Sequence, residues 1–375
     1  MMSSRYIPNT FTSLHTLGNT ESLLKASMEE IIKNSPPTGL YRHDLLSGLW
    51  HGPTGLAYLF LHVSSVHPDL RISNHRAITW AHSYIQGHRQ HVHLESRHCG
   101  LASEQLAFAA VRAAVTKDLS HVREFVANIP AILEGESYPN EMLYGRAGTL
   151  YLLRMIRYWV PDSTPIVELP ILQISQKIIS EGPDWKWHDK RYLGAVHGDI
   201  GIITQLVLTT PTLASQLAPK LISLLETQLA NGNWPSSEGK EATSLTQFCH
   251  GAPGFVLSLS SLKPFFPAIR DRIDAAVRKG RGCIWREGLL RKEPSLCHGI
   301  FSNALALPAG PHREHFLAFA TPEKMAEYIK YDRSMFEPAD YGSRYSLTAG
   351  YSPSAAWTWM MRSRESPKLV AYNDV

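Results

Sequence analysis

The chain has 375 residues, of which 19% are charged, and its formal net charge is +4. This weak charge and the absence of a Lys/Arg run exclude nucleic acid as an expected partner. There is no run of 18 apolar residues and no apolar signal-peptide core in residues 1–8, so no transmembrane segment is expected.

The four cysteines show no disulfide spacing, which is typical of a protein in a reducing compartment. We therefore expect a cytoplasmic protein, and peripheral membrane association through a partner stays open. The length alone would allow two average domains.

The first predicted helix begins near residue 19. Asn19-Thr20-Glu21 is a helix start signal, and Leu24, Met28 and Ile31 follow at helical spacing. Residues 1–18 are expected to be a loosely ordered N-terminal segment. Residues 19–375 are expected to form one domain, because the repeated units described below extend along this whole range.

A glycine that follows a short polar or aromatic element and precedes an apolar run recurs along the whole chain. The intervals lie between 45 and 53 residues, which indicates an array of repeated units. The leading glycines are Gly52, Gly100, Gly145, Gly198, Gly251, Gly299 and Gly350.

The segments between the glycines distinguish a helical array from a propeller of similar period. Leucines at 217, 221, 225 and 229 recur every fourth residue, whereas residues 56–61 and 255–259 are almost uniformly apolar. Each unit is therefore predicted to contain an amphipathic helix, a glycine turn and a buried helix. Seven such units predict an all-α fold, a seven-fold α/α toroid whose glycine turns gather at one end around a cavity.

Two of these turns contain a Cys-His pair followed by glycine, at Cys249-His250 and Cys297-His298. Thiolate and imidazole are ligands that Zn²⁺ prefers, so the turns are candidates for a metal site. The alternative is that both cysteines are inert core residues, which buried cysteines often are.

The same motifs resemble those of the lanthionine synthetase C-like family, closer to its stand-alone eukaryotic members than to bacterial lantibiotic cyclases. The resemblance spans about residues 15–360, and the family fold is a seven-fold α/α toroid. Its most specific parts are the Phe-Cys-His-Gly-Ala-Pro-Gly run at 248–254 and the Leu-Cys-His-Gly run at 296–299. Residues 232–237 and 143–148 also match.

This resemblance implies a zinc ion held by Cys249, Cys297 and His298, with the fourth position left for water or substrate. It implies an acid/base role for His197 and a supporting catalytic role for Glu141. A structural histidine and a carboxylate at a helix start are the respective alternatives.

The resemblance also implies that His250 assists catalysis and that Lys292 contacts glutathione. His250 would donate to the carbonyl oxygen of an electrophile, or else make a structural hydrogen bond to a loop carbonyl. Lys292 would bind a carboxylate of a small acidic thiol, or else be a solvated loop charge.

The family further implies a function: zinc-dependent activation of a thiol, glutathione in the first instance, for addition to dehydroalanine or dehydrobutyrine residues of a peptide. The alternative is a non-catalytic zinc- and glutathione-binding scaffold. Two cysteines argue against the Asp-Cys-His set of prenyltransferase β subunits. Toroid glycosidases need paired carboxylates, and Glu141 and Asp199 are the only good candidates in the turns.

The sequence departs from the family pattern after Cys297-His298-Gly299, where it continues Ile300-Phe301-Ser302-Asn303 and has lost a glycine. The seventh turn, around Gly350, is also altered. The metal ligands are intact, and the changes concern the shape of the pocket.

Overall fold

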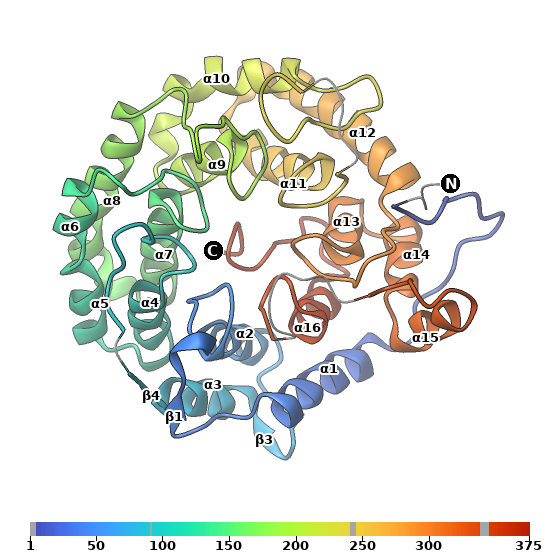
Figure 1. Ribbon diagram of the computed structural model, residues 1–375, viewed down its shortest axis with the longest axis horizontal. Coiled ribbons are helices and arrows are strands. Elements are labelled where there is room, and N and C mark those ends of the chain that lie inside the picture. The colour runs from blue at the N-terminus through green and yellow to red at the C-terminus, as the bar shows by residue number, and fades with distance from the viewer. Residues whose placement is uncertain (1–4, 91, 241–244, 338–344) are drawn as a thin grey trace.

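The computed structural model describes residues 5–90, 92–240, 245–337 and 345–375. Its helices form two concentric rings, so the predicted all-α toroid is confirmed (Figure 1). The strands are four two-residue segments within the described ranges, and they contribute little to the architecture.

Seven helices form the inner ring, and each contacts the next around a closed circle. They are buried on nearly all sides; in α2, for example, every residue from Pro53 to Val63 is buried. A helix that is apolar all round belongs in such an interior. The inner helices are α2 (Pro53–Val66), α4 (Glu104–Thr116), α7 (Arg146–Trp159), α9 (Asp199–Thr209), α11 (Ala252–Leu262), α13 (Ile300–Ala306) and α16 (Tyr351–Met361).

Most outer helices are amphipathic and bury one face against the inner ring, whereas α6 packs on α8, and α15 buries none of its residues and packs on α14. In α10 the buried residues include Leu217, Leu221 and Leu224, which follow the spacing expected for one helix face. The outer helices are α1 (Thr20–Asn34), α3 (Ala77–Gln86), α5 (Leu119–Val126), α6 (Ile129–Glu134), α8 (Thr164–Ser180), α10 (Ala214–Glu226), α12 (Arg270–Glu287), α14 (Pro311–Phe319) and α15 (Pro322–Tyr331).

Among the outer helices, the main partner of each inner helix from α2 to α13 is the one that follows it, so α2 pairs with α3 and α11 with α12. The sequence predicts the opposite order within a unit, an outer helix followed by its own inner helix. The difference matters at the chain ends, where α1 packs against α16 (Figure 1). The first helix therefore completes the last unit and closes the ring.

Short elements connect the helices. The sixth inner helix, α13, has seven residues and ends before Pro308, which lacks the N–H that another turn would need. Single-turn 3-10 helices are η1 (His43–Leu45), η2 (Pro161–Ser163), η3 (Pro211–Leu213), η4 (Lys263–Phe265) and η5 (Pro267–Ile269). Strand β1 (Leu40–Tyr41) pairs in parallel with β4 (His88–Arg89), and β2 (Arg71–Ile72) pairs antiparallel with β3 (His75–Arg76).

The described part of the N-terminal segment, residues 5–18, runs along the outside of the sixth unit. The Ile7 N–H donates to the Leu289 carbonyl, and the Arg5 carbonyl accepts from the Arg291 N–H. Further along, the His15 N–H donates to Nδ1 of His315 at 2.9 Å. These bonds bring the segment next to the loop that carries Lys292.

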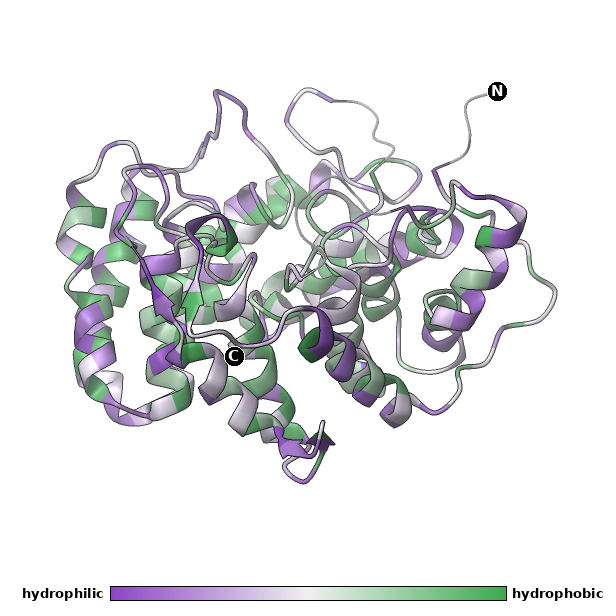
Figure 2. Ribbon diagram, turned by 60° about the horizontal axis from the view of Figure 1, so that its bottom comes forward, coloured by the Kyte–Doolittle hydropathy of each residue, from purple (hydrophilic) through white to green (hydrophobic). Residues whose placement is uncertain are grey.

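Hydrophobic residues are concentrated in the helices, and the connecting loops are mainly neutral to hydrophilic (Figure 2). The buried apolar side chains form one core cluster that includes members of all seven inner helices. Among the described residues, no helix combines the length and the apolar character that crossing a bilayer requires.

Candidate metal centre

The loops that precede the inner helices form a ring, and backbone hydrogen bonds join six of its seven junctions. Between the fourth and fifth loops, Gly194 lies against the carbonyl of Cys249. Elsewhere an N–H of one loop donates to a carbonyl of the next, from Leu49 to Leu101, Leu101 to Met142, Met142 to Val196, Cys249 to Cys297, Cys297 to Thr348 and Leu347 to Trp50. This ring holds side chains from distant repeats at fixed positions around the toroid axis.

The predicted repeat is offset in the second unit. Gly100 is expected to lead the second inner helix, but α4 begins after Ser103, whose side chain accepts from the Leu106 N–H. Gly100 serves a different purpose, because a Cβ there would lie 2.6 Å from the backbone nitrogen of Gly145. It allows the second and third loops to approach closely.

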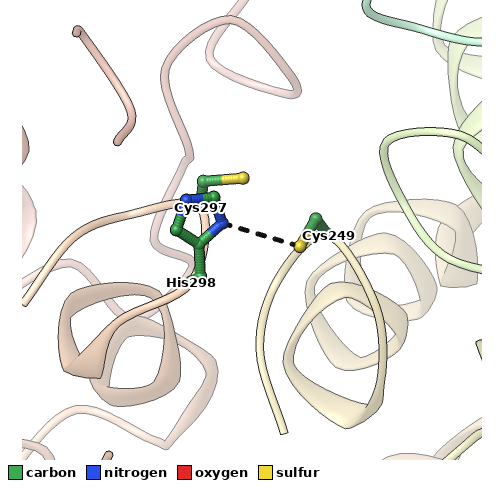
Figure 3. Close-up of side chains that lie close together, drawn as sticks. All are labelled: Cys249, Cys297 and His298. Carbon is green, nitrogen blue, oxygen red and sulfur yellow. Dashed lines mark hydrogen bonds between the residues drawn. The ribbon is translucent and has the colours of Figure 1, made fainter. Parts of the chain in front are cut away.

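The fifth and sixth loops bring Cys249, Cys297 and His298 together, as Figure 3 shows. One ligand atom from each lies within 4.8 Å of the others, and Nδ1 of His298 is 3.8 Å from Sγ of Cys249. All three residues are buried. Two thiols and an imidazole that converge in this way suit a metal ion, and three protein ligands leave one coordination position for a substrate.

The local backbone explains why the first cysteine faces this point. Gly251 has φ of +115°, a conformation that favours glycine, and a Cβ there would lie 2.1 Å from the Leu245 carbonyl oxygen. The side-chain oxygen of Asn233 accepts from the N–H of Ala252, the first residue of α11. The same side chain donates to the Leu245 carbonyl, so Asn233 fixes the turn that presents Cys249.

The two thiols are unequal because they lie side by side. A hydrogen bond from the Cys297 thiol holds the pKa of Cys249 well below its usual range, despite burial, and His298 adds to the effect. The same interaction, together with burial, raises the pKa of Cys297. Without a metal ion the pair therefore holds one proton, and a cation would replace it.

Glu141 and His197 form a second, adjoining group. Oε2 of Glu141 lies 2.5 Å from Nδ1 of His197 and also accepts from the Leu143 N–H at 3.0 Å. Oε1 accepts from the Tyr144 N–H. The carboxylate is thus fixed by backbone donors on its own loop, and it orients the histidine of the next loop so that Nε2 remains for another partner.

His250 lies between this pair and the metal ligands. Its ring centroid is 6.1 Å from that of His197, and its charge interacts with those of Cys249 and His298. Burial lowers the pKa of His250, so the imidazole is neutral near pH 7. Its buried Nδ1 has no hydrogen-bond partner among the described residues, so the structural bond from this nitrogen to a loop carbonyl is not observed.

Lys292 reaches the metal ligands through a residue that the sequence did not mark as functional. Its Nζ donates to Oε1 of Gln247 at 2.7 Å, and Nε2 of Gln247 lies 3.0 Å from Sγ of Cys249. Burial lowers the pKa of Lys292, and the nearby cysteines oppose the shift. In the sequence, the only feature that indicates a role for Gln247 is its position two residues before Cys249 in the same motif.

Trp187 covers His197 and was also not predicted as a site residue. The two rings are stacked, with centroids 4.1 Å apart and an interplanar angle of 6°. Trp187 belongs to the long loop 182–193. The ring centroid of Tyr192, in the same loop, lies 5.7 Å from that of His250. An aromatic-rich loop before a glycine turn is the sequence feature that indicates such a cover.

The other two cysteines and Asp199 are separate from this group. Cys99 and Cys283 are buried with pKa values raised by burial to about 12, which is typical of inert core thiols. Asp199 is fully buried and its Oδ2 lies 2.9 Å from Nε of Arg191 and 3.1 Å from Nζ of Lys220. Glu141 and Asp199 thus have separate partners, which does not fit the carboxylate pair of a glycosidase.

Comparisons with known proteins bear on the family and the fold of the chain. Residues 20–309 match the family described as lanthionine synthetase C-like protein. Glutathione S-transferase LANCL1 of Danio rerio is 28% identical over 306 residues, which cover 76% of this chain and 72% of the relative. LanC-like protein GCL1 of Arabidopsis thaliana is 29% identical over 205 residues, covering 50% of this chain and 46% of that protein.

Among solved structures, nisin cyclase is similar, with a TM-score of 0.62 and 14% sequence identity. The match covers 92% of this chain and 95% of the cyclase. At this level of identity the likeness concerns the fold alone, and it supports the ring of inner and outer helices.

Proposed function

This chain belongs to the lanthionine synthetase C-like family, and from that premise we propose that it activates a thiol for addition to an alkene. The thiol in this proposal is glutathione, and the alkene is a dehydroalanine or dehydrobutyrine residue of a peptide or protein. The product is a thioether. The name of the Danio rerio relative, a glutathione S-transferase, supports the choice of thiol.

Cys249, Cys297 and His298 would hold a zinc ion, since thiolate and imidazole are its preferred ligands and their atoms converge within 4.8 Å. Zinc bound there would favour the thiolate form of an incoming thiol, and the thiolate is the nucleophile. Two such cysteines must stay reduced, so a cytoplasmic location is part of the proposal.

Lys292 and Gln247 would bind the polar part of the thiol. The Lys292 ammonium lies one hydrogen-bonded side chain away from Cys249, which suits a carboxylate of glutathione whose sulfur is at the metal ligands. A partly desolvated ammonium binds a carboxylate more strongly than a solvated one does.

His197 would transfer the thiol proton to the α-carbon of the alkene. Its Nδ1 faces Glu141, so Nε2 would take the proton of the thiol. The sulfur then bonds to the β-carbon of the alkene, the π electrons move toward the carbonyl oxygen, and Nε2 returns the proton to the α-carbon. Glu141 would stabilise the intermediate imidazolium, and His250 would face the oxygen on which negative charge develops.

The observation that carries this proposal is the proximity of the Glu141–His197 pair to a Cys-Cys-His cluster, linked by His250. The test has two steps. Purified protein should contain about one zinc per chain, and it should join glutathione to a synthetic dehydroalanine peptide. A folded protein without zinc, or a zinc-loaded protein without any addition above the uncatalysed rate, would rule out the mechanism.

The alternative is a zinc- and glutathione-binding scaffold, and His197→Asn separates the two. If the protein is an enzyme, this variant keeps glutathione binding but loses turnover by about 10²- to 10⁴-fold. A scaffold would show equal binding and no turnover in either protein.

A further inference from the structure

The last seven residues of the chain, 369–375, form a C-terminal tail that lies inside the toroid. Residues 369–374 are buried, and the C-terminus is drawn at the centre of the inner ring in Figure 1. A polar terminus such as Asn373-Asp374-Val375 would ordinarily remain in solvent. Its burial therefore needs specific partners.

Those partners come from the first and third inner helices, α2 and α7. The Asp374 carboxylate accepts from the hydroxyls of Tyr58 at 2.7 Å and Tyr151 at 3.0 Å, and lies 3.1 Å from Nε2 of His62. Arg154 donates to the backbone carbonyls of Tyr372 and Val375. The tail is thus anchored by charge and hydrogen bonds on its polar side.

The tail also contacts the fifth loop. Tyr372 packs edge-on against Phe248, with ring centroids 4.9 Å apart, and its hydroxyl lies 2.5 Å from that of Ser258. Phe248 directly precedes Cys249. The tail therefore supports the turn that presents a metal ligand.

Between the tail and the ring of loops lies a small cavity of about 30 Å³. All seven loops and the tail contribute to its walls. In six of the loops the wall includes a residue that takes part in the backbone ring, and in the fifth loop the wall residue is Phe248. The lining residues are Leu49, Trp50, Leu101, Met142, Leu143, Ala195, Val196, Phe248, Cys297, Thr348, Val370, Ala371 and Tyr372.

We infer that this axial cavity is a subsite for an alkyl group on the electrophile, and that Val370 of the tail determines which alkyl group fits. The inference rests on the proposed function. It concerns the β-methyl of dehydrobutyrine, which dehydroalanine lacks, and longer alkyl groups at the same carbon.

Two observations favour an alkyl group. The lining is almost wholly apolar, so a carboxylate or amide placed there would lose its hydrogen bonds to water without replacement. The volume is small: a cavity needs about 10–15 Å³ to hold one water molecule, so 30 Å³ accepts a methyl or ethyl group but no peptide segment.

Position supports the same assignment. Cys297 borders the cavity, while Val196 and Met142 on the opposite side adjoin His197 and Glu141 in sequence. An alkene between the thiolate and the proton donor would therefore lie next to the cavity. The polar end of the thiol has its own partners at Lys292 and Gln247, so the cavity remains for the electrophile.

The test compares dehydroalanine and dehydrobutyrine versions of one peptide, with glutathione and zinc-loaded protein. Val370→Phe fills the cavity and should lower kcat/KM for dehydrobutyrine about ten-fold or more relative to dehydroalanine. Val370→Ala enlarges it and should shift the ratio the other way. Leu369→Ala is the matched control, because Leu369 is equally buried but does not line the cavity.

A filling variant at a second position tests the inference even if Val370→Phe does not fold. Leu101→Phe fills the cavity from the opposite wall and should change the ratio in the same direction as Val370→Phe. If the ratio is unchanged in both filling variants, or moves as much in Leu369→Ala, the cavity is only a packing void and the inference is wrong.

Failure of the proposed function would look different. If the wild type adds glutathione to neither alkene, the subsite is tested by calorimetric binding of the two thioether products, made chemically. Weaker binding of the methyl-bearing product to Val370→Phe, with the other product unaffected, would uphold the subsite alone. Equal effects on both products would overturn it.

Discussion

Nδ1 of His197 lies 2.5 Å from Oε2 of Glu141, although the two residues are 56 positions apart in the sequence. The contact exists because the Met142 N–H donates to the Val196 carbonyl, which aligns the third and fourth loops. A carboxylate fixed by its own backbone thereby sets the orientation and tautomer of a histidine in the neighbouring repeat.

Glu141→Gln should impair proton transfer without removing the metal. A glutamine cannot stabilise an imidazolium and can favour the other tautomer, so kcat should fall by about 10²- to 10⁴-fold. Zinc content and glutathione affinity should stay at wild-type values. Steady-state kinetics with elemental analysis checks this, and an unchanged kcat would remove Glu141 from the mechanism.

Cys297→Ala should abolish zinc binding, because two remaining ligands do not hold the ion stably. Cys283→Ala is the matched control, since Cys283 is also a buried cysteine but lies outside the cluster. Elemental analysis should give about one zinc per chain for the wild type and the control. Retention of zinc in Cys297→Ala would show that the ion is held elsewhere.

Removal of zinc with a chelator should expose one reactive thiol pair. At pH 8, iodoacetamide should then modify the Cys249–Cys297 pair, which shares a single proton. Cys99 and Cys283 should stay unmodified because burial raises their pKa values to about 12. Peptide mass mapping before and after chelation checks this, and early labelling of Cys99 would contradict it.

Lys292→Met should weaken glutathione binding and leave zinc content unchanged. Loss of a charge-assisted hydrogen bond costs about 1.5–3 kcal/mol, so the KM for glutathione should rise by about 10- to 100-fold. A thiol without carboxylates, such as 2-mercaptoethanol, should show little change. Equal losses for both thiols would mean that Lys292 acts on the metal cluster through Gln247 rather than on the substrate.

The stability of the protein should depend on the protonation of His315. Burial lowers the pKa of His315 to about 4, and its Nδ1 accepts from the His15 N–H. An unfolded histidine has a pKa of about 6.5, so the folded state binds fewer protons between these values. The free energy of unfolding is therefore complete above about pH 6.5 and falls toward pH 4, by at most about 1.4 kcal/mol per pH unit.

Urea unfolding at pH 7.5 and pH 5 measures this fall. His315→Gln should lose part of the pH dependence, whereas His43→Gln, at an exposed position, should behave like the wild type. Identical pH profiles for all three proteins would exclude His315 as the source.

The C-terminal tail should contribute substantially to stability through Asp374. Hydrogen bonds and charge from His62, with the Tyr58 and Tyr151 hydroxyls, outweigh burial and hold the pKa of this carboxyl below its usual range. Asp374→Ala leaves buried polar groups unsatisfied, at a cost of about 1–3 kcal/mol for each. Thermal unfolding should show a lower Tm than for Asp69→Ala, whose side chain is exposed.

The sequence by itself determined the features that are local or periodic. The regular spacing of glycines before apolar runs predicted seven helix pairs in a ring, and the Cys-His pairs in two neighbouring turns indicated a metal site. The resemblance to the family, and not the spacing, selected Cys249, Cys297 and His298 as its ligands. These predictions rest on short-range geometry, since Cys249 and Cys297 each stand three positions before an inner helix and so occupy equivalent places in neighbouring repeats.

Tertiary structure decided what joins distant segments. The pairing of α1 with α16, the stacking of Trp187 on His197 and the burial of the C-terminal tail all depend on the closed ring. It brings together residues as far apart as Tyr58 and Asp374, which are separated by 316 positions. Such contacts leave no periodic signal in one sequence. In the sequence, Asp374 is an ordinary charged residue near a chain end. Folding places Tyr58, Tyr151 and His62 around it, and these partners make its burial favourable.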